Sequence, residues 1–290
     1  MNIQQNILDS VAISIVATIL GSLLSATLAW LYTKRKIPQS HRVAVIGFPQ
    51  AGKTSLIVSI FAFYFRHGVT GATILPRGEE TIRRVNMHIA EMESGRGVSS
   101  TRDQDLFAYR AEVLRKSLIP FFDSRYKLEM GDFPGEQSED FVLSDEPWLH
   151  NTNYFEWAMG ADTFLFVIEA PKAIMNELDY VAAQKSAFRA AWQRIQEHHI
   201  DGARSLRRKA TILVYTKADV LLDVRMLKKD RMFALEELKM KLDIMFADLI
   251  NYMCQSAPRF RTVLTSVVAR NLEERVGVEE VARLILPKSK

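Results

Sequence analysis

A short run near the start of the chain has the residue types and spacing of a phosphate-binding loop. Residues 43–54 read VAVIGFPQAGKT, so Gly47, Gly52, Lys53 and Thr54 match the pattern G-x-x-x-x-G-K-[ST]. Apolar residues precede the pattern and a helix-like run over 55–65 follows it, which is the order that a strand, a tight turn and a helix N-terminus require. A chance match in an ordinary strand–turn–helix is the alternative, and this order disfavours it.

Each residue type in this loop has a distinct predicted task. Gly47 permits the turn, and Gly52 lets the backbone N–H groups approach an anion without a Cβ in the way. Lys53 would reach the β- and γ-phosphates, and the Thr54 hydroxyl would hold Mg²⁺. The residues predicted to contact the phosphates are Gly47, Pro49, Gln50, Ala51, Gly52, Lys53, Thr54 and Ser55.

A second candidate element, D-x-x-G, follows a predicted strand over 126–130. Asp132 and Gly135 hold its fixed positions in the sequence Gly-Asp-Phe-Pro-Gly-Glu. In a phosphate-loop protein, such a carboxylate reaches the metal through its water, and the glycine N–H meets the γ-phosphate. An ordinary Asp-Phe-Pro-Gly turn is the alternative, because Pro and Gly in this order form turns readily. The position after a phosphate loop favours the metal-site interpretation.

The elements that must position these residues are predicted from hydrophobic patterning. We expect strands over 41–46, 106–114, 126–130, 163–169, 209–215 and 261–264, and helices over 55–65, 79–93, 173–199, 228–254 and 278–286. Strands that alternate with helices predict an α/β fold with a doubly wound, mostly parallel sheet. In such a sheet the ligand lies outside the carboxyl ends of the strands, and every motif falls at such an end.

With these motifs in this order, the chain resembles the Ras-like and translation-factor-related (TRAFAC) class of P-loop GTPases. The segments that carry the resemblance are 47–54, 132–135 and 216–219, and it covers residues 40–288. The resemblance implies a G domain that binds GTP or GDP with Mg²⁺ and hydrolyses GTP. It also implies a conformational switch that recruits a protein partner.

The segment Thr216-Lys-Ala-Asp219 resembles the [NT]-K-x-D motif with which this class recognises guanine. There the Asp accepts hydrogen bonds from the guanine N1–H and exocyclic amine, and the stem of the Lys, here Lys217, packs over the ring. Adenine lacks both donors, so the Asp oxygens would stay unpaired with the wrong base. Ser266 and Val267, after the last strand, resemble the S-A-[KL] element whose backbone contacts the guanine oxygen, although Val replaces its usual Ala.

The catalytic positions implied by the resemblance are Lys53, Thr101, Gly135 and Glu136. Thr101 is the predicted switch threonine, which would bind Mg²⁺ together with Thr54 and Asp132. Glu136 departs from the class, which has a water-positioning Gln after D-x-x-G, and a carboxylate there is repelled by phosphate oxygens. We therefore predict slow intrinsic hydrolysis that a partner's group accelerates in trans.

Two other functions stay open at this point. Glu136 favours a scaffold or pseudo-GTPase subunit of a membrane complex, which binds the nucleotide with little turnover. A related ATPase is the third hypothesis, and Asp219 argues against it.

The amino-terminal segment predicts a membrane anchor. Val11–Leu31 contains no charged residue and is long enough to cross a bilayer as a helix, and Lys34–Lys36 follow it. Basic residues on this flank place the rest of the chain in the cytoplasm. We expect an anchor over 1–36 and a GTPase domain over 37–290 with an insertion around 72–104. This layout is similar to that of the signal recognition particle receptor β-subunit.

Small and hydroxyl side chains on one face of the predicted anchor would permit helix–helix pairing in the membrane. They are Ser14, Thr18, Gly21, Ser22 and Ser25. The alternative is that the hydroxyls bond to their own helix.

Composition narrows the remaining choices. The chain has 290 residues, of which 48% are hydrophobic, so we expect a folded protein. The net charge of +4 gives no case for a nucleic-acid partner. Basic runs at 204–209 and 225–231 could face anionic lipid, but solvated surface is the favoured interpretation. The single cysteine, Cys254, lies in an apolar helical run and is predicted to be buried.

Overall fold

The fold was determined as a computed structural model. It describes residues 14–30, 39–94, 107–116, 123–132, 157–175, 178–199, 206–207, 209–222, 228–267 and 275–287.

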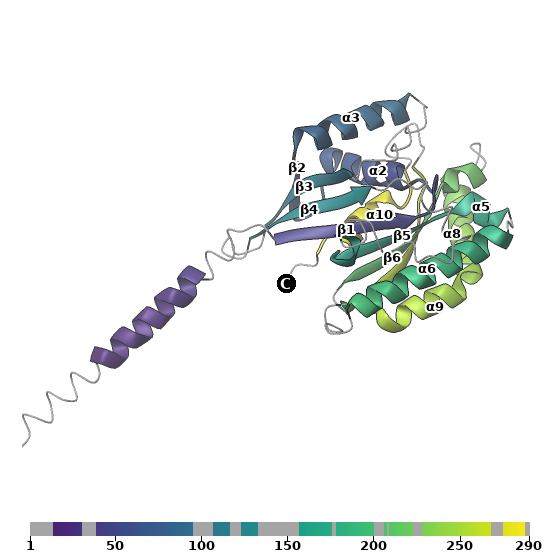
Figure 1. Cartoon of the computed structure of the whole chain (residues 1–290). Coiled ribbons are helices and arrows are strands. Elements are labelled where there is room, and N and C mark those ends of the chain that lie inside the picture. Colours follow the sequence, from purple (N-terminus) through teal and green to yellow (C-terminus); the bar gives the residue numbers. More distant parts are fainter. Residues whose placement is uncertain are drawn as a thin grey trace, which may run out of the picture.

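A seven-stranded sheet of order β2-β3-β4-β1-β5-β6-β7 forms the centre of the domain (Figure 1). Its strands are β1 (Gln39–Gly47), β2 (Ala72–Pro76), β3 (Phe107–Arg115), β4 (Ser124–Asp132), β5 (Thr163–Glu169), β6 (Ala210–Thr216) and β7 (Phe260–Leu264). Strands β4, β1, β5, β6 and β7 run parallel to one another. Strand β3 pairs antiparallel with β4, and the edge strand β2 pairs antiparallel with β3. The predicted mostly parallel α/β sheet is confirmed.

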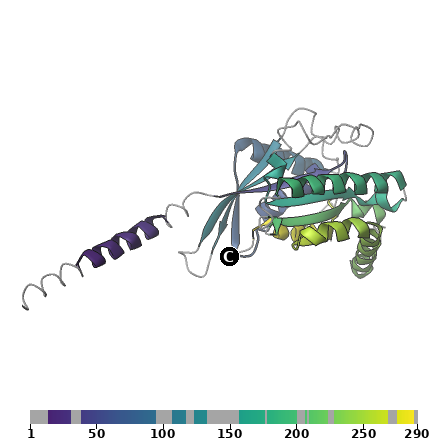
Figure 2. The same cartoon turned by 60° about the horizontal axis from the view of Figure 1, so that its bottom comes forward.

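Helices cover both faces of the sheet (Figure 1). They are α2 (Lys53–Arg66), α3 (Glu79–Glu93), α5 (Ala170–Ile174), α6 (Leu178–His198), α8 (Lys228–Met245), α9 (Ala247–Ser256) and α10 (Val278–Ile285), with a 3₁₀ turn, η5, at Ala218–Leu221. Side chains of α2, α3 and α10 share one hydrophobic cluster, and those of α6, α8 and α9 share the other. Helices α6 and α9 run alongside each other (Figure 2).

Strand β1 shows why the centre of the sheet is apolar on both sides. Val43 and Val45 belong to the cluster beneath α2, whereas Ala44, between them, belongs to the opposite cluster. All residues of β5 and β6 are buried. A central parallel strand has no face toward water, so a continuous apolar run is required there.

Two segments differ from the sequence-based expectation. The helix predicted over 228–254 is two helices, because the backbone departs from regular helix at Phe246, whose side chain is buried in the core. The helix predicted over 173–199 is likewise divided into α5 and α6. Strand β2 was not predicted; it lies in the 72–104 segment and is short, ending at Pro76 on the sheet edge, where a proline costs no ladder bond.

Cys254 is exposed on α9, so its predicted burial is wrong. Its neighbour Met253 is the buried residue of that turn. The apolar run identified the helix correctly but did not determine which way each side chain of the turn faces.

The structure describes the amino-terminal helix over residues 14–30. Within the described part of the chain, no helix combines the length and hydropathy needed to cross a membrane, so the predicted anchor over Val11–Leu31 is not confirmed. The hydroxyls of Thr18, Ser22 and Ser25 donate to carbonyls three or four residues earlier in the same helix. These bonds correspond to the alternative in which the hydroxyls on the small-residue face bond to their own helix.

Candidate functional site

The phosphate-loop sequence forms a tight turn between the end of β1 and the first residue of α2. Gly47 lies so close to β5 that a Cβ there would be 2.7 Å from the carbonyl oxygen of Val167. Gln50 and Gly52 both have positive φ, 58° and 83°. Because residues with positive φ alternate with a residue of ordinary φ, successive backbone N–H groups turn toward one point and form a concave site for an anion.

Lys53 is held inside this turn. Its side chain is buried, and its ammonium donates to the carbonyls of Gly47 and Phe48, both at 2.8 Å. Burial lowers the pKa of Lys53 to about 8, an effect that Asp132 partly opposes. A buried cation of this kind is stabilised by an anion placed at the loop.

Thr54 and Asp132 lie side by side at the start of α2 and the end of β4. The Thr54 hydroxyl donates to Asp132 Oδ2 at 2.9 Å, with Oδ1 at 3.1 Å. Because the hydroxyl hydrogen is engaged by the carboxylate, the hydroxyl can offer its lone pairs to a cation. Hydroxyl and carboxylate oxygens are hard ligands that suit Mg²⁺, which keeps several waters and takes few protein ligands.

The segment 216–219 is joined directly to the phosphate loop. The Thr216 hydroxyl donates to the carbonyl of Ala51 at 2.6 Å, across a sequence separation of 165 residues. Lys217 adopts a left-handed conformation at φ 59°, and its Cε lies 4.0 Å from the position that a Cβ on Gly52 would take. The stem of Lys217 therefore passes over the loop.

Asp219 is oriented by the residues that directly follow β7. The Ser266 hydroxyl donates to Asp219 Oδ1 at 3.1 Å, and Ser266 itself is fully buried. Val267, next to it, is also buried. The backbone N–H of Ala218 donates to the Thr265 carbonyl at 3.2 Å, so β7 fixes the turn that carries the aspartate.

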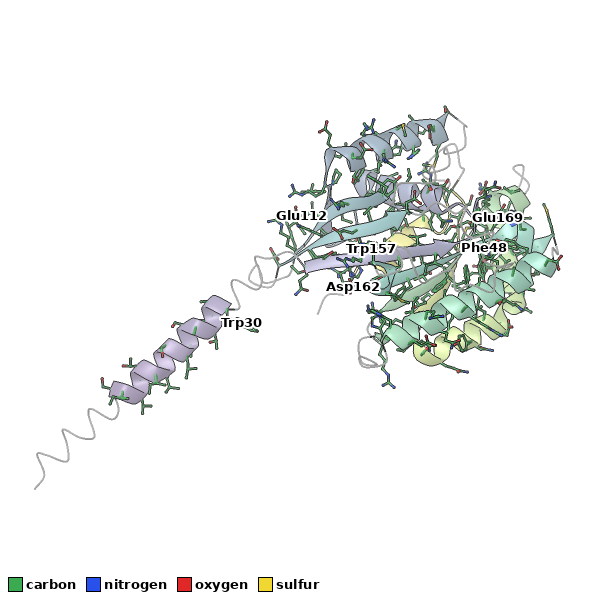
Figure 3. The ribbon with its side chains drawn as sticks, viewed as in Figure 1. Trp30, Phe48, Glu112, Trp157, Asp162 and Glu169 are labelled. Carbon is green, nitrogen blue, oxygen red and sulfur yellow. The ribbon has the colours of Figure 1, made fainter. Side chains whose placement is uncertain are left out.

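Glu169, at the end of β5, is a member of the site that the sequence did not identify. Its carboxylate pairs with Lys217 at 2.8 Å and with Lys172 at 3.7 Å. Figure 3 shows Glu169 and Phe48 near each other at the same end of the sheet. A charged residue that closes an otherwise apolar central strand is the signal that could have identified it.

A ring cluster lies next to this ion pair. The Tyr180 hydroxyl accepts a hydrogen bond from the Glu169 backbone N–H at 3.0 Å, and the Phe48 ring meets the Tyr180 ring edge-on at 6.3 Å between centroids. The end of β5 is therefore tied to the phosphate loop through side chains as well as through the sheet.

The structure brings together most of the residues predicted to form the site. The loop residues Gly47 to Ser55 with Asp132, Thr216, Lys217, Asp219, Ser266 and Val267 all lie at the carboxyl ends of β1, β4, β6 and β7 or directly after them. Thr101, Gly135 and Glu136 lie outside the described residues. Across the described part of the chain, no three His, Cys, Asp or Glu side chains gather as a metal-binding group.

The arrangement can bind a phosphorylated ligand that also carries a planar polar group. Lys53 and the backbone N–H groups of the loop supply positive charge at one end, and Asp219 supplies hydrogen-bond acceptors at the other. The contact between Thr216 and Ala51 makes these two ends parts of one site.

Comparison with known families and structures gives three findings. The family model described as "Double-GTPase 2" matches residues 41–285. Roco2 RocCORdC of Methanosarcina barkeri, solved bound to GDP, is 12% identical with a TM-score of 0.36; the alignment covers 84% of this chain and 47% of that one. A GTP-binding protein of Sulfolobus solfataricus, solved in complex with GDP, is 13% identical with a TM-score of 0.37, covering 96% and 60% respectively.

The chain thus aligns with about half of the first structure and 60% of the second. Among curated proteins, no sequence matches significantly.

Proposed function

The chain belongs to the Double-GTPase 2 family, and from this premise we propose that it binds guanine nucleotide with Mg²⁺ and hydrolyses GTP to GDP and phosphate as a slow molecular switch. The observation that supports this most directly is the 2.6 Å hydrogen bond from Thr216 to the Ala51 carbonyl. It joins the base-recognition segment to the phosphate loop, as a single nucleoside phosphate requires. Membership of the TRAFAC class is part of the same proposal.

Base selection is assigned to Asp219. Its carboxylate accepts from the guanine N1–H and exocyclic amine, and Ser266 holds it in the orientation for both bonds. Adenine presents no donor at these positions, so the carboxylate would be desolvated without compensation. Lys217 covers the base with its stem, and the Glu169 carboxylate fixes its ammonium.

Phosphate binding is assigned to Lys53 and the loop N–H groups. Mg²⁺, held by Thr54 and Asp132, would neutralise charge on the phosphates. Lys53 stabilises the negative charge of the β- and γ-phosphates, and burial within the loop excludes water from this contact. The sequence assigns the γ-phosphate contacts to Thr101 and Gly135, and Glu136 motivates the prediction of slow turnover.

Competition binding by GDP, GTP and ATP to purified protein tests the base assignment. We expect both guanine nucleotides to bind at least about a hundredfold more tightly than ATP, since the Asp219 carboxylate would lose both of its hydrogen bonds to the base with adenine. Asp219→Asn should abolish this preference, because its amide presents a donor to the guanine N1–H. Asp248→Asn, at a surface ion pair on α9, is the matched control. Equal binding of ATP and GTP would contradict the proposal and favour the ATPase.

Hydrolysis is tested in the same preparation by single-turnover conversion of labelled GTP. A slow rate that rises on addition of membrane extract supports a switch whose partner acts in trans. No conversion under either condition would favour the nucleotide-binding scaffold, and rapid conversion without a partner would contradict the role given to Glu136.

We also propose that the amino-terminal segment attaches the domain to a membrane and leaves the domain in the cytoplasm, in a layout like that of the signal recognition particle receptor β-subunit. Supporting this, the described part of the helix carries exposed apolar side chains, including Leu20, Leu24 and Trp30 at 59, 64 and 57%. Leucines and a tryptophan in such positions favour lipid and its interface. Full-length chain should sediment with membranes after alkaline extraction and a chain lacking residues 1–36 should not; equal behaviour of the two would contradict attachment.

A further inference from the structure

A pocket lies at the end of the sheet opposite the phosphate loop. It has a volume of about 330 Å³ and lies between the first residues of β1, β5 and β6 on one side and residues 284–287, at the end of α10 and just after it, on the other. His41, at its wall, stands six residues before Gly47 on β1, which is about 20 Å along a strand. The pocket is therefore separate from the proposed nucleotide site.

Among the described residues, three basic side chains and one carboxylate line this pocket. His41, Lys209 and Arg259 supply the basic groups, and Asp162 supplies the acid. The Lys209 ammonium donates to the carbonyl of Ala161, a contact that neutralises no charge. With Lys209 and Arg259 both cationic, the described side chains that line the pocket include two positive charges and one negative charge even when His41 is neutral.

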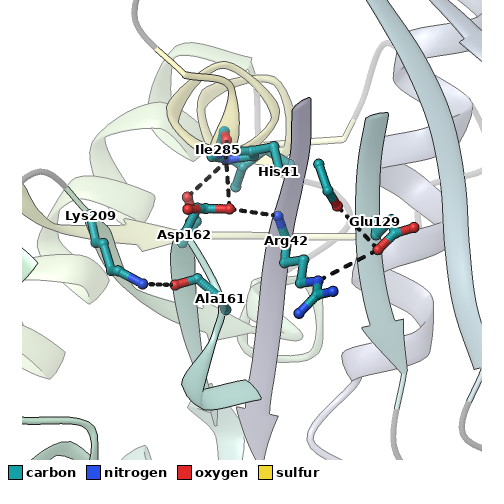
Figure 4. A network of polar contacts seen from close by, with 9 residues as sticks. His41, Arg42, Glu129, Ala161, Asp162, Lys209 and Ile285 are labelled. Carbon is teal, nitrogen blue, oxygen red and sulfur yellow. Dashed lines mark hydrogen bonds and ion pairs between the residues drawn. The ribbon is translucent and has the colours of Figure 1, made fainter. Parts of the chain in front are cut away.

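The Asp162 carboxylate is engaged in contacts with residues of β1 (Figure 4). Asp162 Oδ2 accepts from the Arg42 backbone N–H at 3.0 Å and lies 3.8 Å from His41 Nδ1. The other ring nitrogen of His41 is 2.8 Å from the Ile285 carbonyl. Asp162 and His41 thus tie β1 to β5 and to α10.

The basic groups repel one another across the pocket. Burial lowers the pKa of His41, and the charges of Arg259 and Lys209 lower it further, against the opposing effects of Asp162 and the Ile285 carbonyl. Burial also lowers the pKa of Lys209, which Asp162 partly opposes. A bound anion would offset the cost of burying these positive charges and would reduce their mutual repulsion.

One wall of the pocket is apolar and is formed by Leu284, Leu286 and Pro287. An anion that carries a carbon substituent would fill both halves, with its charge on the basic side and its carbons on the apolar side. The volume is sufficient for a phosphate group and a few carbon atoms.

We propose that this pocket binds a phosphate ester, with Lys209 and Arg259 on the phosphate and the Leu284–Pro287 wall against its carbon substituent. Such a ligand is either a phospholipid head group or a soluble phosphate ester. Eight residues, 31–38, lie in the sequence between the described part of the amino-terminal helix and β1, and eight residues can span at most about 28 Å. A head group is the expected source if that helix attaches to a membrane, so this choice rests on the proposed attachment.

Calorimetric titration of the full-length chain in a neutral detergent tests the proposal. The protein is first saturated with GDP and Mg²⁺, so that added phosphate cannot occupy the loop around Lys53; failure of GDP to bind would be seen at that step and would count against the proposed function instead. The probes are inorganic phosphate, glycerol 3-phosphate and dihexanoyl phosphatidic acid below its micelle concentration.

Binding of the short-chain lipid alone identifies a head-group site, and binding of glycerol 3-phosphate with similar affinity identifies a soluble ester. Lys209→Gln and Arg259→Gln should each weaken binding by about tenfold or more, because each removes a charged contact to phosphate. Lys185→Gln, at the surface ion pair with Asp248, should leave it unchanged. No binding of any probe, or equal loss in the control variant, would overturn the proposal.

Discussion

Nucleotide binding should be accompanied by proton uptake at Lys53. The pKa of this lysine is lowered from 10.5 to about 8 by burial in the loop. Contact with phosphate oxygens stabilises the charged form and returns the pKa toward its ordinary range. Binding therefore takes up a proton wherever the loop lysine was neutral beforehand, and affinity falls as the pH rises through 8.

The size of the effect follows from this pKa. About one tenth of a proton is taken up per nucleotide at pH 7, about half at pH 8 and about nine tenths at pH 9. The affinity for GDP with Mg²⁺ should fall about fourfold between pH 7 and pH 8.5. The upper limit avoids the pH at which the guanine N1–H itself ionises.

Calorimetry in pairs of buffers with different ionisation enthalpies measures the uptake directly. Lys53→Arg is the control, since a guanidinium stays protonated throughout and should show no increase in uptake between pH 7 and pH 8. Equal uptake by the unmodified protein at these two pH values, or an undiminished increase in the arginine variant, would refute the assignment to Lys53.

Three substitutions test other contacts of the site. Gly47→Ala places a Cβ 2.7 Å from a backbone oxygen of β5 and should lower the melting temperature by several degrees in thermal unfolding, whereas Gly21→Ala, with nothing within 4 Å, should not. Glu169→Gln removes the charge that pairs with Lys217, the lysine proposed to cover the base, and should weaken GDP binding about three- to tenfold by fluorescence titration. Glu237→Gln, at the exposed pair with Lys241, is its control, and equal effects of the two substitutions would contradict the proposed role. Thr54→Ala should remove most of the Mg²⁺ dependence of GDP dissociation, and an unchanged dependence would exclude the hydroxyl as a ligand.

Features encoded by neighbouring residues could be predicted from the sequence. The loop around Lys53 and the strand before it follow from a fixed spacing and an apolar run, and the structure places both as expected. Strand β5 has the bounds that were predicted. Such signals are local, because periodicity and turn chemistry act within a few residues.

Features that depend on contacts across the sheet could not be predicted in this way. Glu169 acquires its place in the site only because β6 brings Lys217 beside it, 48 residues later in the chain. The departure from regular helix at Phe246 leaves the apolar periodicity of 228–254 intact, so the pattern does not reveal it. Strand β2 is too short and too exposed to show a pattern of its own, and its partner β3 defines it.

The position of β1 in the sheet has a mechanical consequence. This strand is hydrogen-bonded along one edge to β4 and along the other to β5, both parallel to it. A force applied through the residues before Gln39 would load both ladders in shear, so that many bonds resist together rather than one at a time. The phosphate loop, at the far end of β1, would bear tension only after those ladders had slipped. Pulling single molecules from residue 39 and from residue 72 on the edge strand would compare the two geometries, and a lower unfolding force from residue 39 would contradict this consequence.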